Sequence, residues 1–167
     1  MIYAFDTYYF DDYAHTVCIA FEEWTSEKET QIFMEKTEVT SDYESGAFYK
    51  RELPCILSLL KQIKLYEGDI IIVDGYVTLG NEGKMGLGGY LYEALEQKFP
   101  VIGIAKNEFS TPDLQRKMIF RGESETPLFL TVKGADADEI KAEVEQMYGD
   151  FRIPALLKKL DQLTRMR

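Results

Sequence analysis

Four charged residues of this sequence have the types and positions needed to hold a divalent cation and act on a phosphate group. Asp6, Asp74 and Lys106 each follow a short apolar run of the kind that forms a buried strand. In an α/β protein the ends of parallel strands lie at one edge of the sheet, where ligands collect. Glu52, near the expected start of a helix, adds a third carboxylate. Three carboxylates beside one ammonium group could bind a divalent metal.

Each of these residues also has an ordinary structural explanation. Asp6 interrupts an apolar strand, and a buried acid is costly unless it is paired or metal-bound, but it could equally cap a turn. Asp74 precedes Gly75, where the backbone can approach a ligand closely or simply turn. The helix dipole would stabilise Glu52, and Lys106 could be a surface lysine. Taken singly, the residues leave both explanations open.

Hydrophobic spacing predicts the elements that must position these side chains. Two antiparallel hairpins at the start of the chain are followed by alternating helices and strands, the latter apolar on both faces as in a parallel sheet. The expected strands cover residues 1–9, 16–24, 29–39, 69–74, 101–105 and 128–132. The expected helices begin near Glu52, with Pro54 in the first turn, near Leu87, at about Asp138 and at Ile153-Pro154. The segments 11–14, 40–47 and 107–126 are expected to be turns or irregular.

The composition describes one folded domain, residues 1–167. A hydrophobic content of 46% with 13% aromatic residues excludes a disordered chain. No apolar run is long enough to span a bilayer, and the first residues lack the basic start of a signal peptide. Cys18 and Cys55 lie in apolar runs without partners at metal-ligand spacing, which excludes zinc and favours reduced thiols in a cytoplasmic protein.

Other kinds of site fit the sequence poorly. The glycines between 80 and 89 suggest a phosphate-binding loop, but Met85 stands where Ser or Thr is required. His15 is the only histidine and is expected at the surface beside the first turn, so a catalytic triad lacks a base. Tyr43, in a polar loop, could stack on a nucleobase if exposed, or pack against the core.

Several segments, in order along nearly the whole chain, resemble the endonuclease V family. Two of them resemble the family's aspartate motifs, around Asp6 and Asp74. Another, which begins at Tyr43, resembles the segment with the family's wedge tyrosine and Arg-Glu pair. A further one resembles its strand that ends in lysine. The matching segments are residues 5–9, 43–54, 71–75, 86–88, 100–106, 127–134 and 151–154.

The resemblance implies a ribonuclease H-like fold, which the order of the elements also suits, with a mixed α/β sheet, leading antiparallel strands and flanking helices. It implies cleavage of DNA containing deoxyinosine, or RNA containing inosine, with Mg²⁺ or Mn²⁺ as cofactor. Asp6 and Asp74 would hold the metal, and Glu52 would complete the set. Lys106 would neutralise charge on the phosphate. The substrate-binding residues that it implies are Tyr43, Gly46, Arg51 and Gly75.

The chain departs from the family pattern in three places. Residues 79–84 lack the family's His-Pro-Arg segment, Ala135 stands where a second histidine is expected, and the prolines around Tyr43 are absent. The family's histidines support the metal and its water. The sequence leaves open whether Asp136 or Asp138, close to the second position, substitutes for the missing histidine.

Three hypotheses about function therefore stay open. The first is a metal-dependent endonuclease acting on single-stranded or lesion-containing nucleic acid. The second is a catalytically weakened nucleic-acid-binding or interaction protein on the same scaffold, which the missing histidines and the net charge of −10 favour. The third is a phosphodiester enzyme for a small nucleotide, which would suit an acidic chain.

Overall fold

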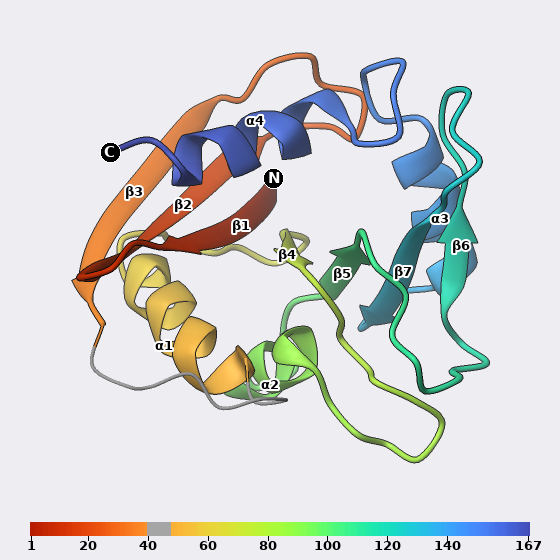
Figure 1. Ribbon diagram of the computed structural model, residues 1–167, viewed down its shortest axis with the longest axis horizontal. Helices are drawn as coiled ribbons and strands as arrows, with labels where there is room; N and C mark the ends of the chain where they lie inside the picture. Colours follow the sequence, from red (N-terminus) through yellow and green to blue (C-terminus); the bar gives the residue numbers. More distant parts are fainter. Residues whose placement is uncertain (40–47) are drawn as a thin grey trace.

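Seven strands form one mixed sheet in the computed structural model, which describes residues 1–39 and 48–167 (Figure 1). Across the sheet the strands follow the order β3-β2-β1-β4-β5-β7-β6. The strands span Ile2–Tyr9 (β1), Tyr13–Phe21 (β2), Gln31–Glu38 (β3), Ile70–Asp74 (β4), Val101–Ala105 (β5), Lys117–Ile119 (β6) and Leu128–Lys133 (β7). The helices span Phe48–Leu60 (α1), Leu87–Ala94 (α2), Ala137–Glu145 (α3) and Ala155–Thr164 (α4).

The first three strands form the antiparallel meander that the sequence predicts. β1 pairs with β2, and β2 pairs with β3, in antiparallel register. The first turn is shorter than expected, because Tyr13 and Ala14 belong to β2. Ala14 is buried opposite Tyr9, and the Tyr13 ring stacks on Phe10, so side-chain packing extends the strand toward the turn.

The central strands β1, β4 and β5 run parallel, again as expected. Phe5 on β1 lies beside Val73 on β4, and Asp74 lies beside Ile104 on β5. These strands have sheet neighbours on both sides and helices on both faces, which explains their unbroken apolar runs. Their carboxyl ends therefore meet at one edge of the sheet.

Helix α1 begins at Phe48, so Pro54 lies inside the helix and not in its first turn. The predicted start at Glu52 was wrong, because a proline inside a helix is usually costly and marks a boundary. Here the buried residues Ile56, Leu59 and Leu60 pack on the sheet. Tertiary packing of that face stabilises the helix despite the proline, which lies on the exposed side.

The segment 107–126 was expected to be irregular but contains the strand β6. β6 pairs antiparallel with β7, which pairs antiparallel with β5. β6 has three residues, of which only Ile119 is buried. A strand this short shows no hydrophobic period in the sequence. The sheet therefore has a parallel centre with antiparallel strands on both sides.

Helices cover both faces of the sheet (Figure 1). α1 and α2 pack on one face, with side chains such as Val73. α3 and α4 pack on the other face, with Ala4 and Ile72. Successive strand residues point to opposite faces, so the alternation that includes Ala4 and Ile72 brings Asp6 and Asp74 to the face covered by α4.

Both cysteines are buried and free, as the sequence predicts. Burial raises the pKa of the Cys18 thiol, which keeps it protonated and unreactive. The Cys55 thiol donates a hydrogen bond to the carbonyl oxygen of Arg51, at 3.4 Å, within α1. Across the two described ranges, no helix combines the length and the apolar character needed to cross a membrane.

Candidate functional site

The structure brings Asp6, Asp74 and Lys106 together at the carboxyl edge of the central strands. Asp6 lies in β1, Asp74 ends β4, and Lys106 directly follows β5. All three line an open cleft with a volume of about 30 Å³. Apolar side chains make up most of the remaining lining: Phe5, Ile72, Val73, Ile104, Leu128, Ile153, Pro154, Leu157 and Leu160. A charged group in these surroundings loses part of its hydration.

Asp6 is the most buried charged group of the cleft, with 8% of its surface exposed. Its carboxylate accepts a hydrogen bond from the backbone N–H of Thr7, at 2.9 Å. Burial and, after it, repulsion from Asp74 raise the pKa of Asp6 to about 7, although Thr7 and Lys106 act in the opposite direction. The carboxyl therefore loses its proton near neutral pH.

Asp74 keeps access to solvent at the mouth of the cleft, yet protein atoms closely surround its carboxyl group. Burial is the largest cause that raises the pKa of Asp74, and Lys106 lowers it. Because the carboxylates of Asp6 and Asp74 repel each other, protons bind to the pair and not to either residue independently. The pair is open to a ligand from one side.

Glu52 approaches this pair from α1, on the other face of the sheet. Burial, and then repulsion from Asp6 and Asp74, raise the pKa of Glu52 well above its ordinary value, while Arg51 lowers it. Glu52 is not among the residues that line the cleft. The third predicted carboxylate is therefore electrostatically linked to the pair but lies beside the cleft.

Of the predicted substrate-binding residues, Gly75 directly follows Asp74, and Arg51 lies at a second cavity. Gly75 has a φ of +110°, and nothing lies within 4 Å of the position that a β-carbon would take. The space beside Asp74 is therefore open, and a side chain there would be strained. The Arg51 guanidinium lies 4.0 Å from the ring centroid of Tyr9 and lines this second cavity, of about 310 Å³. Tyr43 and Gly46 lie outside the described residues.

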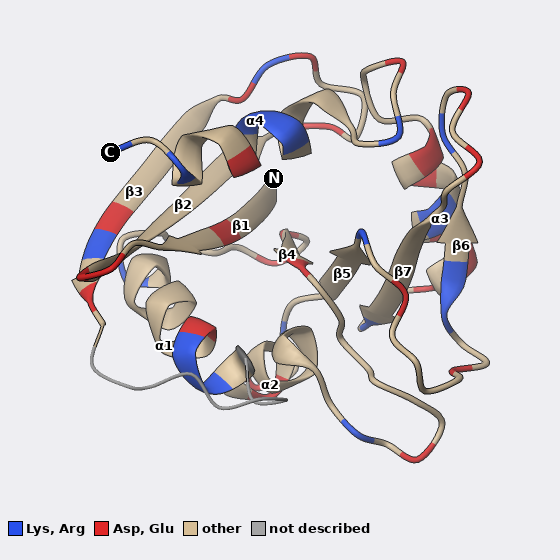
Figure 2. Ribbon diagram, in the orientation of Figure 1, with Lys and Arg blue, Asp and Glu red and all other residues tan. Residues whose placement is uncertain are grey.

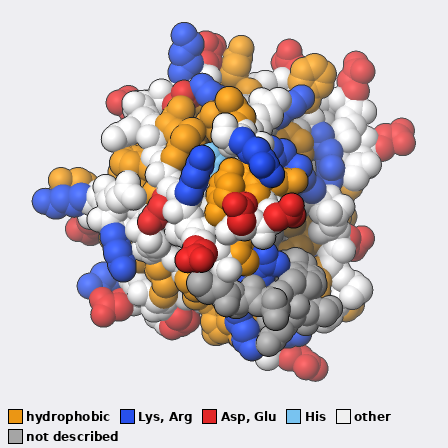
Figure 3. Space-filling view, turned by 60° about the vertical axis from the view of Figure 1, so that its left-hand side comes forward, with side chains coloured by type: hydrophobic (Ala, Val, Ile, Leu, Met, Phe, Trp, Pro, Cys, Tyr) orange, Lys and Arg blue, Asp and Glu red, His pale blue; other side chains and the backbone are white. Residues whose placement is uncertain are grey.

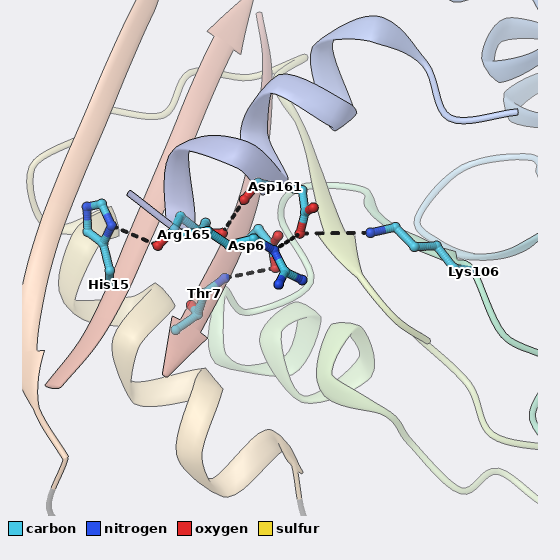
Figure 4. A network of polar contacts seen from close by, with 7 residues as sticks. Asp6, Thr7, His15, Lys106, Asp161 and Arg165 are labelled. Atoms are coloured by element: carbon cyan, nitrogen blue, oxygen red, sulfur yellow. Dashed lines mark hydrogen bonds and ion pairs between the residues drawn. The ribbon is translucent and has the colours of Figure 1, made fainter. Parts of the chain in front are cut away.

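Asp161 of α4 and Arg165, the residue that caps the carboxyl end of this helix, belong to the same site, although neither stands out in the sequence (Figure 4). Asp161 lines the cleft, and its Oδ1 lies 4.0 Å from Nζ of Lys106 and 3.3 Å from Nε of Arg165. One feature of the sequence could have identified Asp161 as a site residue: it follows Leu157 by four residues. That spacing puts an acid in line with the apolar side of the helix.

His15 was expected at the surface but is buried, with 4% of its surface exposed. Its Nδ1 lies 3.0 Å from the carbonyl oxygen of Thr164, which can only accept, so Nδ1 carries the proton (Figure 4). The Thr164 hydroxyl donates to the carbonyl oxygen of Asp161, at 2.6 Å. The prediction was wrong because α4, distant in the sequence, packs over β2. His15 thereby ties β2 to the helix that carries Asp161.

Asp136 and Asp138 have structural partners away from the cleft. Asp136 caps α3 by accepting a hydrogen bond from the backbone N–H of Glu139, at 3.0 Å. Asp138 pairs with Lys117 at 3.1 Å. Neither lines the cleft, so neither takes the place of the missing family histidine.

The donor set of the cleft suits a hard divalent cation. Asp6 and Asp74 offer oxygen ligands, and a cation would relieve the repulsion between them. Within residues 1–39 and 48–167, no three His, Cys, Asp or Glu side chains gather around one point as a complete ligand group. Mg²⁺ is commonly held through one or two carboxylates, with water and substrate phosphate in the remaining positions. Two carboxylates at an open cleft therefore fit such an ion.

Comparisons with known proteins identify related sequences and folds. A sequence model of the family described as Endonuclease V matches residues 1–148. No curated protein matches the chain. The solved structure of endonuclease V from Streptomyces avermitilis superposes with a TM-score of 0.75 at 21% identity, over 98% of this chain and 79% of that chain.

Two animal proteins have the same fold. Human ENDOV superposes with a TM-score of 0.77 at 18% identity, over 98% of this chain and 82% of that chain. Ciona intestinalis endonuclease V was solved in complex with a 23mer DNA containing an inosine followed by a ribo-adenosine. It superposes with a TM-score of 0.76 at 17% identity, over 98% of this chain and 83% of that chain. The ribonuclease H-like fold expected from the sequence is therefore confirmed.

Proposed function

Because the chain belongs to the endonuclease V family, we propose that it is a metal-dependent endonuclease that hydrolyses phosphodiester bonds near deaminated bases, deoxyinosine in DNA or inosine in RNA. The observation that carries the proposal is the cleft in which Asp6 and Asp74 lie beside Lys106. Carboxylates for a cation and an ammonium group for a phosphate oxygen are the groups that this hydrolysis needs. The substrate class follows the inosine-containing DNA bound to the Ciona protein.

Asp6 and Asp74 would hold Mg²⁺ or Mn²⁺, and Glu52 would complete the carboxylate set from the α1 side. When bound, the cation would activate a water molecule and offset the negative charge of the phosphate. The carboxylates must lose their shared proton before they bind a cation. Since the pKa of Asp6 is raised to about 7, we expect metal affinity to increase as the pH rises through neutrality.

Lys106 would contact a phosphate oxygen and stabilise the charge that develops there during cleavage. Its ion-pair partner within the described residues is Asp161, and 4.0 Å between Nζ and Oδ1 is a long contact that a phosphate could replace. Arg165 binds the same Asp161 oxygen at 3.3 Å. Arg165 would therefore hold Asp161 in place when Lys106 turns to the substrate.

The substrate contacts that we propose lie on both sides of the carboxylates. Gly75 leaves room for a nucleotide beside Asp74, and Arg51 presents a cation next to the second cavity. Tyr43 and Gly46 would contact the altered base. The free cysteines suit a reducing compartment, and we place the protein in the cytoplasm.

The proposal is tested by cleavage of end-labelled single strands of DNA and RNA, each with and without one inosine. Mg²⁺ or Mn²⁺ would be present, and Mn²⁺ affinity would be measured by calorimetry on the same samples. We expect a cut near the inosine that disappears in Asp74→Asn, together with weaker Mn²⁺ binding. Asp138→Asn is the matched control, because it removes an aspartate charge outside the cleft.

Three other outcomes would contradict parts of the proposal. Strand binding without any cut, even at low salt and high protein concentration, would support the non-catalytic scaffold. Hydrolysis of small nucleotides but not of strands would move the substrate to that class. Unchanged Mn²⁺ affinity in Asp74→Asn would show that the metal site is placed wrongly.

A further inference from the structure

Aromatic rings gather at the tip of the β1–β2 hairpin, directly beside the cleft. The rings of Tyr8 and Phe10 meet edge to face, with centroids 4.9 Å apart. Phe10 stacks on Tyr13 at 4.8 Å. All three side chains are partly exposed. Together with the cations that lie over them they form a surface that we call the hairpin patch: Tyr8, Phe10, Tyr13, Lys36, Arg165 and Arg167.

Each ring of the hairpin patch carries its own cation. The pairs are Arg165 over Tyr8 (4.8 Å), Arg167 over Phe10 (4.8 Å) and Lys36 over Tyr13 (5.2 Å). All three cations are exposed. Figure 3 shows hydrophobic and basic side chains together on this side of the molecule, and Figure 2 shows basic residues at the end of α4 near the C-terminus. Rings and cations side by side are the groups that bind nucleobases and phosphates.

The hairpin patch continues the line of the cleft. Asp6 and Tyr8 alternate along β1, so both lie on the face covered by α4, and Phe10, just past the strand, contacts the Tyr8 ring. At about 3.3 Å per residue, Phe10 lies about 13 Å beyond Asp6, the length of a short run of nucleotides. Arg165 belongs to both places, because it binds Asp161 in the cleft and lies over Tyr8.

Acidic residues limit how far a strand could follow this surface. Asp11 and Asp12 form the exposed turn just beyond Phe10, and Glu38 lies opposite Tyr13 on β3. They would repel a phosphate that passed the tip of the hairpin. Favourable contacts are therefore concentrated at Tyr8 and Phe10, between the cleft and the turn.

We propose that the hairpin patch binds the single-stranded arm of the nucleic acid that leaves the cleft. The exposed Arg165 and Arg167 would turn from the rings to the phosphates, and bases would take their places on Tyr8 and Phe10. This inference rests on the proposed function, since it names the surface that holds the same substrate. It also explains how a chain of net charge −10 can bind a polyanion: the contacts are local and use stacking as well as charge.

The test compares Phe10→Leu and Arg167→Gln with matched changes in a distant pair of the same kind. Lys64 lies over the ring of Tyr66 at 5.2 Å, and Tyr66 is 60% exposed. This pair precedes β4, so it lies at the opposite end of that strand from Asp74. Tyr66→Leu and Lys64→Gln therefore remove a ring and a charge without touching the hairpin patch.

Binding is measured by fluorescence anisotropy at low salt in EDTA, with labelled single strands that carry one inosine. The strands are short, or extended on one side of the inosine or on the other. We expect one extension to strengthen binding to the wild-type protein and to both controls. Phe10→Leu should weaken binding of that extended strand about tenfold and leave the short strand unchanged. Arg167→Gln should reduce the slope of affinity against salt by about 1.

If Phe10→Leu and Arg167→Gln bind every strand as the wild type does, the inference is wrong. An equal loss in Tyr66→Leu would also overturn it. If the wild type cleaves the strand but the hairpin-patch variants bind it normally, the proposed function stands and the role of the patch is rejected. Binding that depends on the hairpin patch, without any cleavage, would support the patch and reject the proposed function. Should Phe10→Leu fail to fold, the exposed Arg167→Gln decides the question.

Discussion

Asp6 is the residue whose ionisation links the stability of this protein to its chemistry. Its charged form is disfavoured by burial and by Asp74. A buried carboxylate of this kind lowers stability unless something compensates for its charge. A divalent cation would compensate for it, so metal binding, pH and stability should be coupled through this one side chain.

The first prediction concerns the stability of the metal-free protein as a function of pH. In the folded state the pKa of Asp6 is raised from 3.8 to about 7, so between these values the folded protein binds more protons than the unfolded chain. Stability therefore falls as the pH rises from about 4 to about 7. Asp6→Asn should remove this part of the slope. The measurement is the melting temperature in EDTA from pH 4 to 8.

Excess Mg²⁺ at pH 8 is the complementary arm of the same experiment. It should raise the melting temperature of the wild type more than that of Asp6→Asn. The coupling would be refuted by parallel pH profiles of the two proteins in EDTA, because titrating groups away from the cleft contribute equally to both.

The second prediction concerns Lys106. Lys106→Met should lower the rate of strand cleavage at saturating substrate by about 100-fold, because one preorganised positive group would be lost from the phosphate. Mn²⁺ affinity, measured well above neutral pH where the carboxylates are ionised, should change much less than the rate. Single-turnover kinetics and calorimetry measure the two quantities. Lys158→Met, at an exposed position of α4, is the control, and an equal rate loss there would contradict the assigned role.

At the scale of elements, α4 is the part of the fold that completes the site. Its first turn follows Ile153 and Pro154 in the cleft lining, and Asp161 lies near its other end. The preceding loop is held by Arg121, whose guanidinium donates to the carbonyl oxygens of Met147, Gly149, Phe151 and Arg152. Arg152 in turn donates to the carbonyl oxygens of Lys106 and Pro127. These contacts fix the start of α4 against the end of β5.

The third prediction tests the other end of α4. His15→Phe keeps an aromatic ring but leaves the buried carbonyl oxygen of Thr164 without its donor. The free energy of unfolding should fall by about 1–3 kcal/mol, the cost of an unsatisfied buried group. Strand cleavage should also fall, because Asp161 lies in the last turn of this helix and Arg165 directly follows it. Urea unfolding and kinetics measure both effects.

A matched change on the exposed side of α4 separates the two effects of His15→Phe. Lys159 pairs with Glu29 at 2.5 Å, so Lys159→Met also removes a contact between α4 and the first half of the chain. We expect it to leave cleavage unchanged. If His15→Phe is as stable as the wild type, the hydrogen bond does not hold the helix.

At the scale of the whole molecule, a net charge of −10 limits the electrostatic contribution to nucleic-acid binding. Basic and acidic side chains are interspersed over much of the chain (Figure 2). Cations along the proposed path from the cleft to the hairpin patch are few: Lys36, Lys106, Arg165 and Arg167. Arg51 lies on the other side of the carboxylates. Binding should therefore depend on salt only moderately, and stacking should supply much of the affinity.

The fourth prediction makes this quantitative. Four phosphate contacts on a single strand correspond to a slope of about −3 in a plot of log affinity against log salt. Anisotropy titrations of the wild type between low and physiological salt measure it. A slope twice as steep would mean that further cations outside this path contact the strand. Lys64→Gln should not change the slope.

Much of the fold follows from local signals in the sequence. The apolar runs that end at Asp74 and before Lys106 mark the central parallel strands, and the alternation along 1–9 places Asp6 on one face. Local patterns suffice there because strands that are buried on both faces form nearly continuous apolar runs. They fail for β6, which is too short to show a pattern, and for Pro54, whose cost the packing of α1 offsets.

The sequence by itself thus determined that Asp6 interrupts the first strand and that Asp74 and Lys106 follow the central apolar runs, because these features depend on neighbouring residues. Only the tertiary structure decided that Asp161 and Arg165 join them, and that His15 is buried. His15 and Thr164 are 149 positions apart, and no local pattern specifies which helix covers which strand. That choice depends on how whole faces of the sheet and the helices bury their apolar surface together.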